Sequence, residues 1–451
     1  MMADPHSHAR PHEARVRHLD LELSVDFEAR RLEGSVTLDL VVAPGARELV
    51  LDTRDLRVAS VTDAAGAALP FTLAPADALL GAALHVDIES GVTRVIIRYA
   101  TGPDAGALQW LSPAQTAGGA HPFLFTQGHA IETRSWIPTQ DSPSIRQTYD
   151  ASITVPAPLV AAMSAERLPP VASTTGAARV FAFRMREPLP PYLIALAVGD
   201  LAFHETGPRT GVFAEPSLIA RAAHEFAEIE RMIDAAESLL GAYRWGRFDV
   251  MVMPPSFPYG GMENPRLTFT SPSLLAGDRS LTTVVAHELA HAWAGNLVVN
   301  ATWDDFWLNE GFTVYVELRM NELLWGHARA GMLKTYGWRE LCAEVERLGR
   351  SSPDTRLHYE MSGRDPVVGV TAIPYLKGVA FLWTVEIAVG RERFDRWLRG
   401  WFDRHAFGAV TTEDLVRDLD AHLFDGAPPI DLDRWLYQPG LPEEAAPPID
   451  D

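Results

Sequence analysis

The chain lacks the features that mark secreted, membrane-spanning and nucleic-acid-binding proteins. Its 451 residues contain a single cysteine, Cys342, so no internal disulfide can form and an oxidising compartment is not required. No run of 18 or more apolar residues occurs, and the N-terminal stretch MMADPHSHARPHEARVR has no apolar segment before its charges begin. We therefore expect neither a membrane-spanning helix nor a secretory signal, and we predict a cytoplasmic location.

Basic residues are scarce as well. The 39 Lys and Arg residues stand against 59 Asp and Glu, which gives a net charge of −20, and no cluster of Lys and Arg is visible. A surface that follows a phosphate backbone needs such clusters, so no nucleic-acid partner is expected. The acidity is compatible with cationic ligands such as peptide amino termini, and equally with a surface that is merely kept soluble.

What is present is an ordinary globular composition, with 47% apolar and 22% charged residues, over a length that predicts two or three domains. Residues 19–27 alternate strictly between apolar and polar, and shorter alternations follow at 36–40, 84–88 and 95–99. The region up to about residue 205 is therefore predicted to be antiparallel β.

The second half of the chain has a different periodicity. Apolar residues recur at helical spacing from Pro216 to Leu240, and a buried strand is predicted at 248–253. Further helices are predicted at 280–295, 306–325, 328–348, 376–389, 391–406 and 412–423. The chain is thus predicted to be a multidomain α+β protein, with a flexible N-terminus (1–16), a β domain (17–205), a mostly helical domain (206–436) and a Pro- and acid-rich tail (437–451).

The strongest chemical motif is HELAH, residues 287–291. His287 and His291 lie four apart, which at 3.6 residues per turn places them about 40° apart on one helix face, where both imidazoles can bind one ion. Glu288 lies between them, and this HExxH pattern is the signature of zinc peptidases in which the Glu is the general base. A chance match on a solvated helix face is the alternative, and the apolar residues around the motif disfavour it.

A catalytic zinc takes three protein ligands and leaves a fourth position to water. Glu310, separated from His291 by 18 residues and placed on the next predicted helix, is the candidate third ligand. Asp304 and Asp305 compete with it but are predicted to face solvent or to cap that helix. One Zn²⁺ per chain would then support hydrolysis of an amide or an ester.

The stretch PYGGMEN, residues 258–264, follows the predicted strand at 248–253. Its adjacent glycines, Gly260 and Gly261, allow another backbone to approach closely, as an edge strand that receives a peptide requires. Glu263 places an anion next to that groove. A tight turn with an exposed carboxylate explains the same stretch from its residues alone.

Together, HELAHAWAGNLV, WLNEG and PYGGMENP make the chain resemble the aminopeptidase N and leukotriene A hydrolase family of zinc metallopeptidases, with the leukotriene-hydrolase-like branch as the nearest match. The resemblance runs from about residue 15 to the QPGLP stretch and includes TQGHAIETRSWIPTQDSPSIRQTYD, residues 126–150. It implies a saddle-like N-terminal β domain, a thermolysin-like zinc domain, and peptide substrates with a free amino terminus.

Matched residue by residue, the resemblance also implies roles. Glu288 looks like the general base, Glu263 like the anchor for the substrate's α-amino group, and Tyr375 in IPYLKG like the donor that stabilises the oxyanion. The zinc ligands would be His287, His291 and Glu310. The remaining substrate contacts would be Gln127, His129, Tyr259, Gly260, Gly261 and Met262.

The sequence departs from the family pattern in three respects. His129 stands where relatives carry Gln or Glu beside the substrate amine, so amine binding is expected to be weaker or more dependent on pH. Val367 and Val370 replace an Asp and a Tyr used for epoxide chemistry or for basic side chains, so neither epoxide hydrolysis nor a preference for P1 Arg is expected. The helical C-terminal domain of the relatives is missing from the chain, which predicts a more open cleft.

The sequence therefore predicts a zinc-dependent aminopeptidase with a weak preference for small or neutral apolar P1 residues. Two alternatives stay open: an open-cleft zinc endopeptidase, and a catalytically silent protein that binds peptides. Hydrolysis of substrates with a blocked amine would favour the first, and a zinc content near zero would favour the second. No oligomeric state is predicted.

Overall fold

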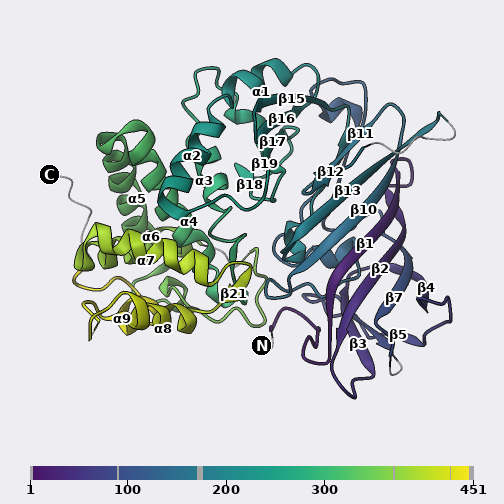
Figure 1. Ribbon diagram of the computed structural model, residues 1–451, viewed down its shortest axis with the longest axis horizontal. Coiled ribbons are helices and arrows are strands. Elements are labelled where there is room, and N and C mark those ends of the chain that lie inside the picture. Colours follow the sequence, from purple (N-terminus) through teal and green to yellow (C-terminus); the bar gives the residue numbers. More distant parts are fainter. Residues whose placement is uncertain (1–3, 89–90, 170–175, 369–370, 427, 446–451) are drawn as a thin grey trace. The chain divides into compact units, whose positions relative to one another are not determined.

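Two compact units make up the structure, a computed structural model that describes residues 4–445 except 89–90, 170–175, 369–370 and 427 (Figure 1). Unit 1 comprises Met1–Glu225 and Arg247–Gly277, and unit 2 comprises Phe226–Gly246 and Asp278–Asp451. Sheets dominate unit 1 and helices dominate unit 2, which confirms the predicted α+β class. The domain boundaries at residues 205 and 436 stay a prediction.

A seven-stranded sheet forms the largest layer of unit 1 (Figure 1). Leu19, Leu21 and Leu23 are buried and the polar residues between them are exposed, as the alternation predicts. The sheet order is β12-β13-β10-β1-β2-β7-β4, with bounds β1 Ala14–Asp26, β2 Arg31–Val42, β4 Arg57–Asp63, β7 Arg94–Ala100, β10 Gln147–Pro156, β12 Glu166–Arg167 and β13 Ala178–Leu189.

One pairing in this sheet corrects the prediction of a purely antiparallel region. Strand β1 runs parallel to β10, with Leu21 opposite Ala151. Only strands joined by a short hairpin are forced to be antiparallel, and a long connection between β1 and β10 permits the parallel arrangement. Alternating side chains reveal that a strand is half-buried, but they do not reveal its direction.

Unit 1 also contains smaller sheets. The four-stranded sheet β11-β14-β9-β8 uses β8 Leu108–Leu111, β9 Phe123–Thr126, β11 Val160–Met163 and β14 Leu196–Gly199, and the three-stranded sheet β3-β6-β5 uses β3 Glu48–Thr53, β5 Phe71–Leu73 and β6 Ala82–Asp87. The five-stranded sheet β15-β16-β17-β19-β18 uses β15 Ala202–Gly207, β16 Thr210–Ala214, β17 Phe248–Val252, β18 Gly261–Met262 and β19 Thr268–Thr270. Strand β18, from the GGM sequence, lies at the edge of its sheet.

A buried ionic network in unit 1 surrounds Arg134, whose side chain has no exposure. Its Nε donates to Asp141 over 3.1 Å, and Asp52 lies 3.9 Å from its Nη1. Burial raises the pKa of Asp141 to about 7, although the charge of Arg134 acts in the opposite direction. All three side chains therefore depend on one another, because removing any of them leaves a buried charge with fewer partners.

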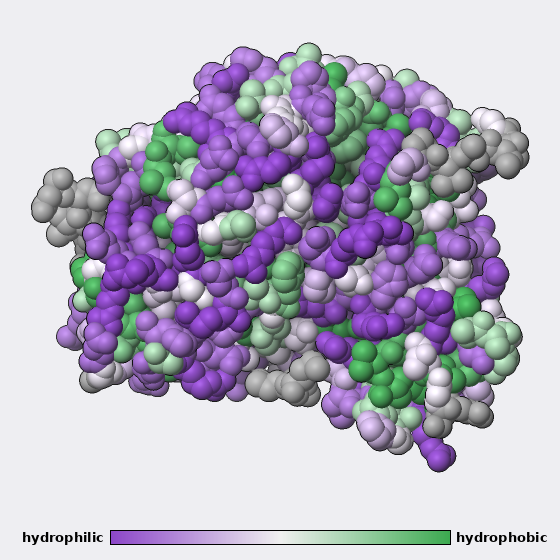
Figure 2. Space-filling model, viewed as in Figure 1, coloured by the Kyte–Doolittle hydropathy of each residue, from purple (hydrophilic) through white to green (hydrophobic). Residues whose placement is uncertain are grey.

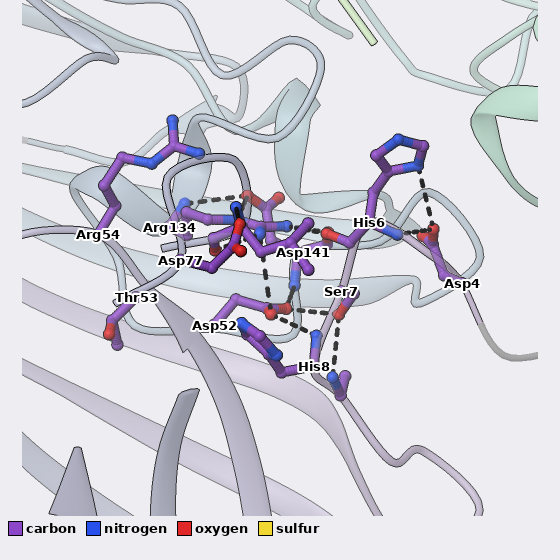
Figure 3. A network of polar contacts seen from close by, with 12 residues as sticks. Asp4, His6, Ser7, His8, Asp52, Thr53, Arg54, Asp77, Arg134 and Asp141 are labelled. Atoms are coloured by element: carbon purple, nitrogen blue, oxygen red, sulfur yellow. Dashed lines mark hydrogen bonds and ion pairs between the residues drawn. The ribbon is translucent and has the colours of Figure 1, made fainter. Parts of the chain in front are cut away.

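Residues 6–8 are bound to this network, in disagreement with the flexible N-terminus that was predicted for residues 1–16 (Figure 3). Ser7 Oγ and His8 N donate to the carboxylate of Asp52 over 2.5 and 2.7 Å, and Arg134 Nη2 donates to the carbonyl oxygen of His6 over 2.7 Å. His6 is completely buried. Contacts between residues far apart in the sequence leave no signal in the local pattern. The local pattern of this segment therefore predicted a flexible terminus.

Helices dominate unit 2, and most lie where helical spacing predicts them. Gly326 and Gly390, which end the helices α4 and α6, have φ values of 88° and 85°, a conformation that favours glycine. The elements of unit 2 are α2 Ile229–Leu240, α3 Thr283–Ala290, α4 Trp307–Trp325, α5 His327–Leu348, α6 Ile373–Val389, α7 Arg391–Arg404, α8 Thr412–His422 and α9 Leu432–Leu436, with β20 Val298–Asn300 parallel to β21 Gly408–Val410.

Two helical predictions need correction. The helix predicted from Pro216 to Leu240 is split into α1 Ile219–Glu225, in unit 1, and α2. The buried carboxylate of Glu225 accepts a hydrogen bond from Gly277 N over 2.7 Å, so a tertiary contact holds the end of α1. Helix α3 spans Thr283–Ala290 instead of the predicted 280–295, and Leu281 is 42% exposed.

The first residues of the predicted Pro- and acid-rich tail (437–451) are packed within unit 2. Lys377 Nζ, on α6, donates to the carbonyl oxygens of Thr355 and Gln438 over 3.0 and 3.1 Å. Gly440 N donates to Thr355 Oγ1 over 2.8 Å, and Gly440 is buried. Proline and acidic content alone therefore misrepresents residues 437–440, because their partners lie on distant elements.

Hydrophilic residues cover most of the face shown in Figure 2, with an apolar area at the lower right, over the region of β3 and β5. A cavity of about 1030 Å³ in unit 1 is lined by the segments that lead into these two strands, including residues 42–47 before β3 and 67–70 before β5. None of its lining residues is a predicted site residue. Across the described part of the chain, every helix is too short or too polar to cross a bilayer.

Candidate metal centre

The last turn of α3 carries the two histidines of the HELAH motif. His287 lies within the helix, His291 is its C-cap, and Glu288 is 6% exposed. The chain then reverses at Gly295, where φ is 99° and an added Cβ would lie 2.4 Å from the side-chain oxygen of Asn309. Glycine at this turn therefore lets the end of α3 approach the first turn of α4 closely.

Helix α4 brings Glu310 to the histidine pair, as the sequence predicts. Glu310 Oε2 lies 3.5 Å from His287 Nε2 and 3.7 Å from His291 Nε2, and these ligand atoms all lie within 4.8 Å of one another. Tetrahedral zinc with bonds of about 2.0–2.2 Å holds such atoms about 3.3–3.5 Å apart. The spacing therefore fits a zinc ion with little adjustment.

Hydrogen bonds at the far nitrogens orient both imidazoles. His287 Nδ1 lies 3.0 Å from Glu317 Oε2, and His291 Nδ1 lies 3.0 Å from both the carbonyl oxygen of Ala294 and Thr313 Oγ1. A carboxylate and a carbonyl can only accept, so each Nδ1 carries a proton, and each Nε2 faces Glu310, where its lone pair would bind a metal ion. This arrangement fits a divalent metal that binds neutral imidazole.

The two histidines differ in their electrostatic environment. Burial lowers the pKa of His287, but the hydrogen bonds that its ring donates to the carboxylates of Glu310 and Glu317 outweigh burial and raise that pKa well above 6.5. Burial lowers the pKa of His291 to about 4, so this ring is neutral. A proton and a metal compete for the same lone pair of His287, because both bind at Nε2.

Sequence reasoning missed Glu317 and Thr313 as supports of the ligands. Both lie on α4, seven and three residues after Glu310. At about 100° per residue, positions i, i+3 and i+7 share one helix face. This spacing could have indicated that Thr313 and Glu317 lie on the same face of the helix as Glu310. Thr313 Oγ1 also lies 3.2 Å from the carbonyl oxygen of Ala294.

The competing acids, Asp304 and Asp305, do not behave as predicted. Asp305 is 1% exposed, and its Oδ1 accepts hydrogen bonds from the backbone N and the Oγ1 of Thr412 over 3.1 and 2.7 Å. Asp304 Oδ1 accepts from Met361 N over 2.7 Å. Asp305 thus binds the first turn of α8 instead of facing solvent or capping α4. Its partner, Thr412, lies far away in the sequence.

Tyr375 lies in the first turn of α6, directly after Pro374, because α6 begins at Ile373 and not at the predicted residue 376. Its side chain is half-buried, and its ring meets the ring of Phe306 edge to face, with centroids 6.1 Å apart. Phe306 is the N-cap of α4, the helix that carries Glu310. The ring contact therefore joins Tyr375, on α6, to the start of α4.

The predicted substrate contacts lie in unit 1, in two neighbouring segments. Gln127 follows β9, and its Oε1 accepts from His129 N over 3.3 Å. The ring of Phe125, on β9, meets that of Phe257, with centroids 5.8 Å apart, which joins this segment to the one that leads into β18. The His129 ring lies edge to face on Tyr192, 5.5 Å away.

The second segment carries the residues of PYGGMEN. Met262 and Glu263 are 5% and 7% exposed, whereas Tyr259 is 38% exposed. Gly261 pairs with Thr270 on β19, and the carbonyl oxygen of Gly260 accepts from Ser271 N over 2.9 Å. The burial of Glu263 disagrees with the alternative of an exposed turn carboxylate. Val367 is 37% exposed, and Val370 lies outside the described residues.

Comparison with known proteins gives two family matches. The model of the peptidase M1 N-terminal domain matches residues 15–193, and the model of the peptidase family M1 domain matches residues 225–431. The chain is 40% identical over 452 aligned positions to leukotriene A-4 hydrolase of Xenopus laevis, covering 98% of this chain and 74% of that protein.

Two further relatives agree with these matches. Leucine aminopeptidase 2 of Aspergillus oryzae is 38% identical, over 94% of this chain and 71% of that protein. Among solved structures, native LTA4 hydrolase from yeast superposes with a TM-score of 0.92 at 34% identity, over 98% of this chain and 70% of that chain.

Proposed function

The chain belongs to the M1 family of zinc metallopeptidases, and from this premise we propose that it is an aminopeptidase that removes the N-terminal residue of peptides. The observation that carries the proposal is the convergence of His287, His291 and Glu310 within 4.8 Å, with both imidazoles oriented from behind. Relatives that carry the name leucine aminopeptidase support this choice of reaction.

Zinc held by these three residues would polarise the scissile carbonyl and lower the pKa of a water molecule. Glu288 is proposed as the general base: a carboxylate oxygen takes one proton from the attacking water as the new C–O bond forms. The same oxygen then delivers that proton to the leaving nitrogen as the C–N bond breaks. The 6% exposure of Glu288 supports this role, because a dry carboxylate exchanges its proton with the substrate and not with solvent.

Tyr375 is proposed to donate its hydroxyl hydrogen to the oxyanion of the tetrahedral intermediate. A donor aimed at this oxygen accelerates acyl transfer by about 10²–10³. Support comes from its place on α6, where the contact with Phe306 limits the orientations of its ring.

Glu263 is proposed to bind the α-amino group of the substrate, which would restrict cleavage to one residue at a time. A buried carboxylate next to an edge strand suits an ammonium ion, because the substrate can pair with both the charge and the strand. Further proposed contacts in the same unit are Gln127, His129, Tyr259, Gly260, Gly261 and Met262.

The test is turnover of a panel of aminoacyl anilides and their N-acetylated counterparts, together with the zinc content. We expect cleavage of the free-amine substrates only, loss of at least about 10³ in rate with Glu288→Ala, and loss of activity on chelation that zinc restores. The exposed helical residue Glu392 gives a matched control, because Glu392→Ala should leave the rate unchanged.

Each alternative gives a distinct result in this experiment. Cleavage of acetylated substrates would indicate an endopeptidase and would remove the role of Glu263 as an amine anchor. Zinc binding without any turnover would indicate a peptide-binding protein. Efficient hydrolysis of a fatty epoxide would contradict the expectation drawn from Val367 and Val370.

A further inference from the structure

Helices α4 and α6 cross at a point where two glycines touch. A Cβ added to Gly311 would lie 2.8 Å from Cα of Gly378, and a Cβ added to Gly378 would lie 2.8 Å from Cα of Gly311. The obstructing atoms belong to backbone, so no side chain can move aside. Helix pairs with ordinary side chains pack about 8–10 Å apart, and small residues at the crossing allow a closer approach.

The crossing lies next to two residues of the proposed mechanism. Gly311 directly follows the metal ligand Glu310 on α4, and Gly378 lies three residues after Tyr375 on α6. Residues three apart on a helix are neighbours on one face. An added Cβ at Gly311 would also lie 3.1 Å from the carbonyl oxygen of Pro374, so the contact extends to the turn that carries the tyrosine.

Ring contacts fix the same two helix segments to each other. Tyr375 meets Phe306 edge to face at 6.1 Å, and Phe381 meets Trp307 edge to face at 5.5 Å. All of these residues except Tyr375 are at most 2% exposed. The start of α4 and the first turns of α6 therefore form one packed body with little freedom to slide.

We propose that the Gly311–Gly378 crossing, together with the contact between Phe306 and Tyr375, sets the position of Tyr375 relative to the carboxylate of Glu310. The two glycines are thus positioning residues for the oxyanion donor. The inference rests on the proposed function. A displacement of about 1 Å far from the reacting atoms can cost about 10²-fold in rate, and an added Cβ requires about that much to restore a normal carbon–carbon distance.

The test is a double-mutant cycle between Gly378→Ala and Tyr375→Phe, with kcat and KM measured on the free-amine anilides. Gly378→Ala should lower kcat by about 10–100-fold with KM changed less than about threefold, and zinc content and zinc affinity should stay at the wild-type level. In the Tyr375→Phe background the same alanine should lower kcat by less than about threefold, because the donor is already gone.

Gly337 on α5 supplies the matched control. Its added Cβ would meet only Leu376 Cδ2, at 3.7 Å, which is an ordinary contact with α6 one residue away from Tyr375. Gly337→Ala should therefore leave kcat unchanged. If Gly378→Ala does not fold, as judged by circular dichroism and thermal unfolding, Phe306→Leu enters the same cycle, because it frees the tyrosine ring without adding atoms at the crossing.

Multiplying effects in the cycle, or full activity of Gly378→Ala, would overturn the positioning role while the aminopeptidase function stands on Glu288→Ala. Full activity of Tyr375→Phe would overturn this inference and the role of the tyrosine, and would leave the metal chemistry intact. A wild type without turnover would remove the proposed function and this inference together.

Discussion

Two of the buried clusters of ionisable side chains among the described residues differ in how their donors and acceptors are oriented. In unit 1, the carboxylates of Asp52 and Asp141 accept hydrogen bonds from backbone and side-chain donors around Arg134. In unit 2, two imidazole Nε2 atoms converge on a carboxylate oxygen of Glu310, while the Nδ1 atoms bond to other acceptors on the far side of each ring.

This difference separates a structural cluster from a functional one. In the first cluster the carboxylate oxygens meet donors that the chain itself supplies, namely the guanidinium of Arg134, a hydroxyl and backbone N–H groups. In the second, three electron-pair donors face a common point, and only a cation or a proton there balances them. Burial and charge alone would not have told the two clusters apart; the direction of the donors does.

The largest expected effect comes from breaking the balanced cluster. Arg134→Met should lower the free energy of unfolding by about 3–5 kcal/mol, because it leaves Asp52 and Asp141 buried with a missing partner. Urea unfolding measures this loss, and zinc affinity should not change. Arg184 is the control: it pairs with Asp150 over 2.7 Å at 39% exposure, so Arg184→Met should cost at most about 1 kcal/mol. Equal losses would show that burial is not the cause.

A smaller effect should follow from disturbing the supports of the metal ligands. Glu317→Gln keeps the shape but weakens the acceptor at His287 Nδ1, so zinc affinity should fall by about 10–100-fold. Thr313→Val should act in the same direction at His291. Competition with a chelator of known affinity measures both. Unchanged zinc affinity in Glu317→Gln would show that the helix alone orients His287.

The smallest effect concerns Lys377, a buried cation for which the described residues supply no ion-pair partner. It extends the comparison of the two clusters to a buried charge that is not paired with a carboxylate. Burial lowers the pKa of Lys377 from 10.5 to about 7, and the charges of Arg434 and Arg356 add to this. Between these two pKa values the unfolded chain binds more protons than the folded chain, so stability should rise with pH.

Between pH 7 and 9 this linkage should stabilise the wild type by about 2 kcal/mol relative to Lys377→Met, which has nothing to titrate there. Urea unfolding at both pH values, with the two proteins side by side, gives the difference. A difference that stays constant with pH would mean that Lys377 keeps its proton when buried.

Much of the fold followed from periodicity, and the failures share one cause. Strict alternation over residues 19–27 predicted β1, and helical spacing predicted α4 to within one residue at its start. Local pattern failed where distant partners decide: in the parallel pairing of β1 with β10, in the pinned segment around Ser7, and at Asp305.

The candidate metal site was predictable because its two histidines are separated by about one helical turn. His287 and His291 share a helix face by their separation alone, and motif knowledge supplied Glu310. Glu317 and Thr313 share a face with Glu310 in the same way, but nothing in the sequence says which residues that face meets. Their role became visible only when α3 and α4 were placed together.

The sequence by itself determined the two kinds of secondary structure, the order in which they occur and the helix face that His287 and His291 share, because each depends on local spacing. Tertiary structure alone decided which carboxylates are supports and which are ligands, and how the N-terminal segment is held. It also decided that two glycines, Gly311 and Gly378, meet at the crossing of α4 and α6. Those features depend on atoms that come together from distant parts of the chain. Local periodicity does not predict which of these parts will be in contact.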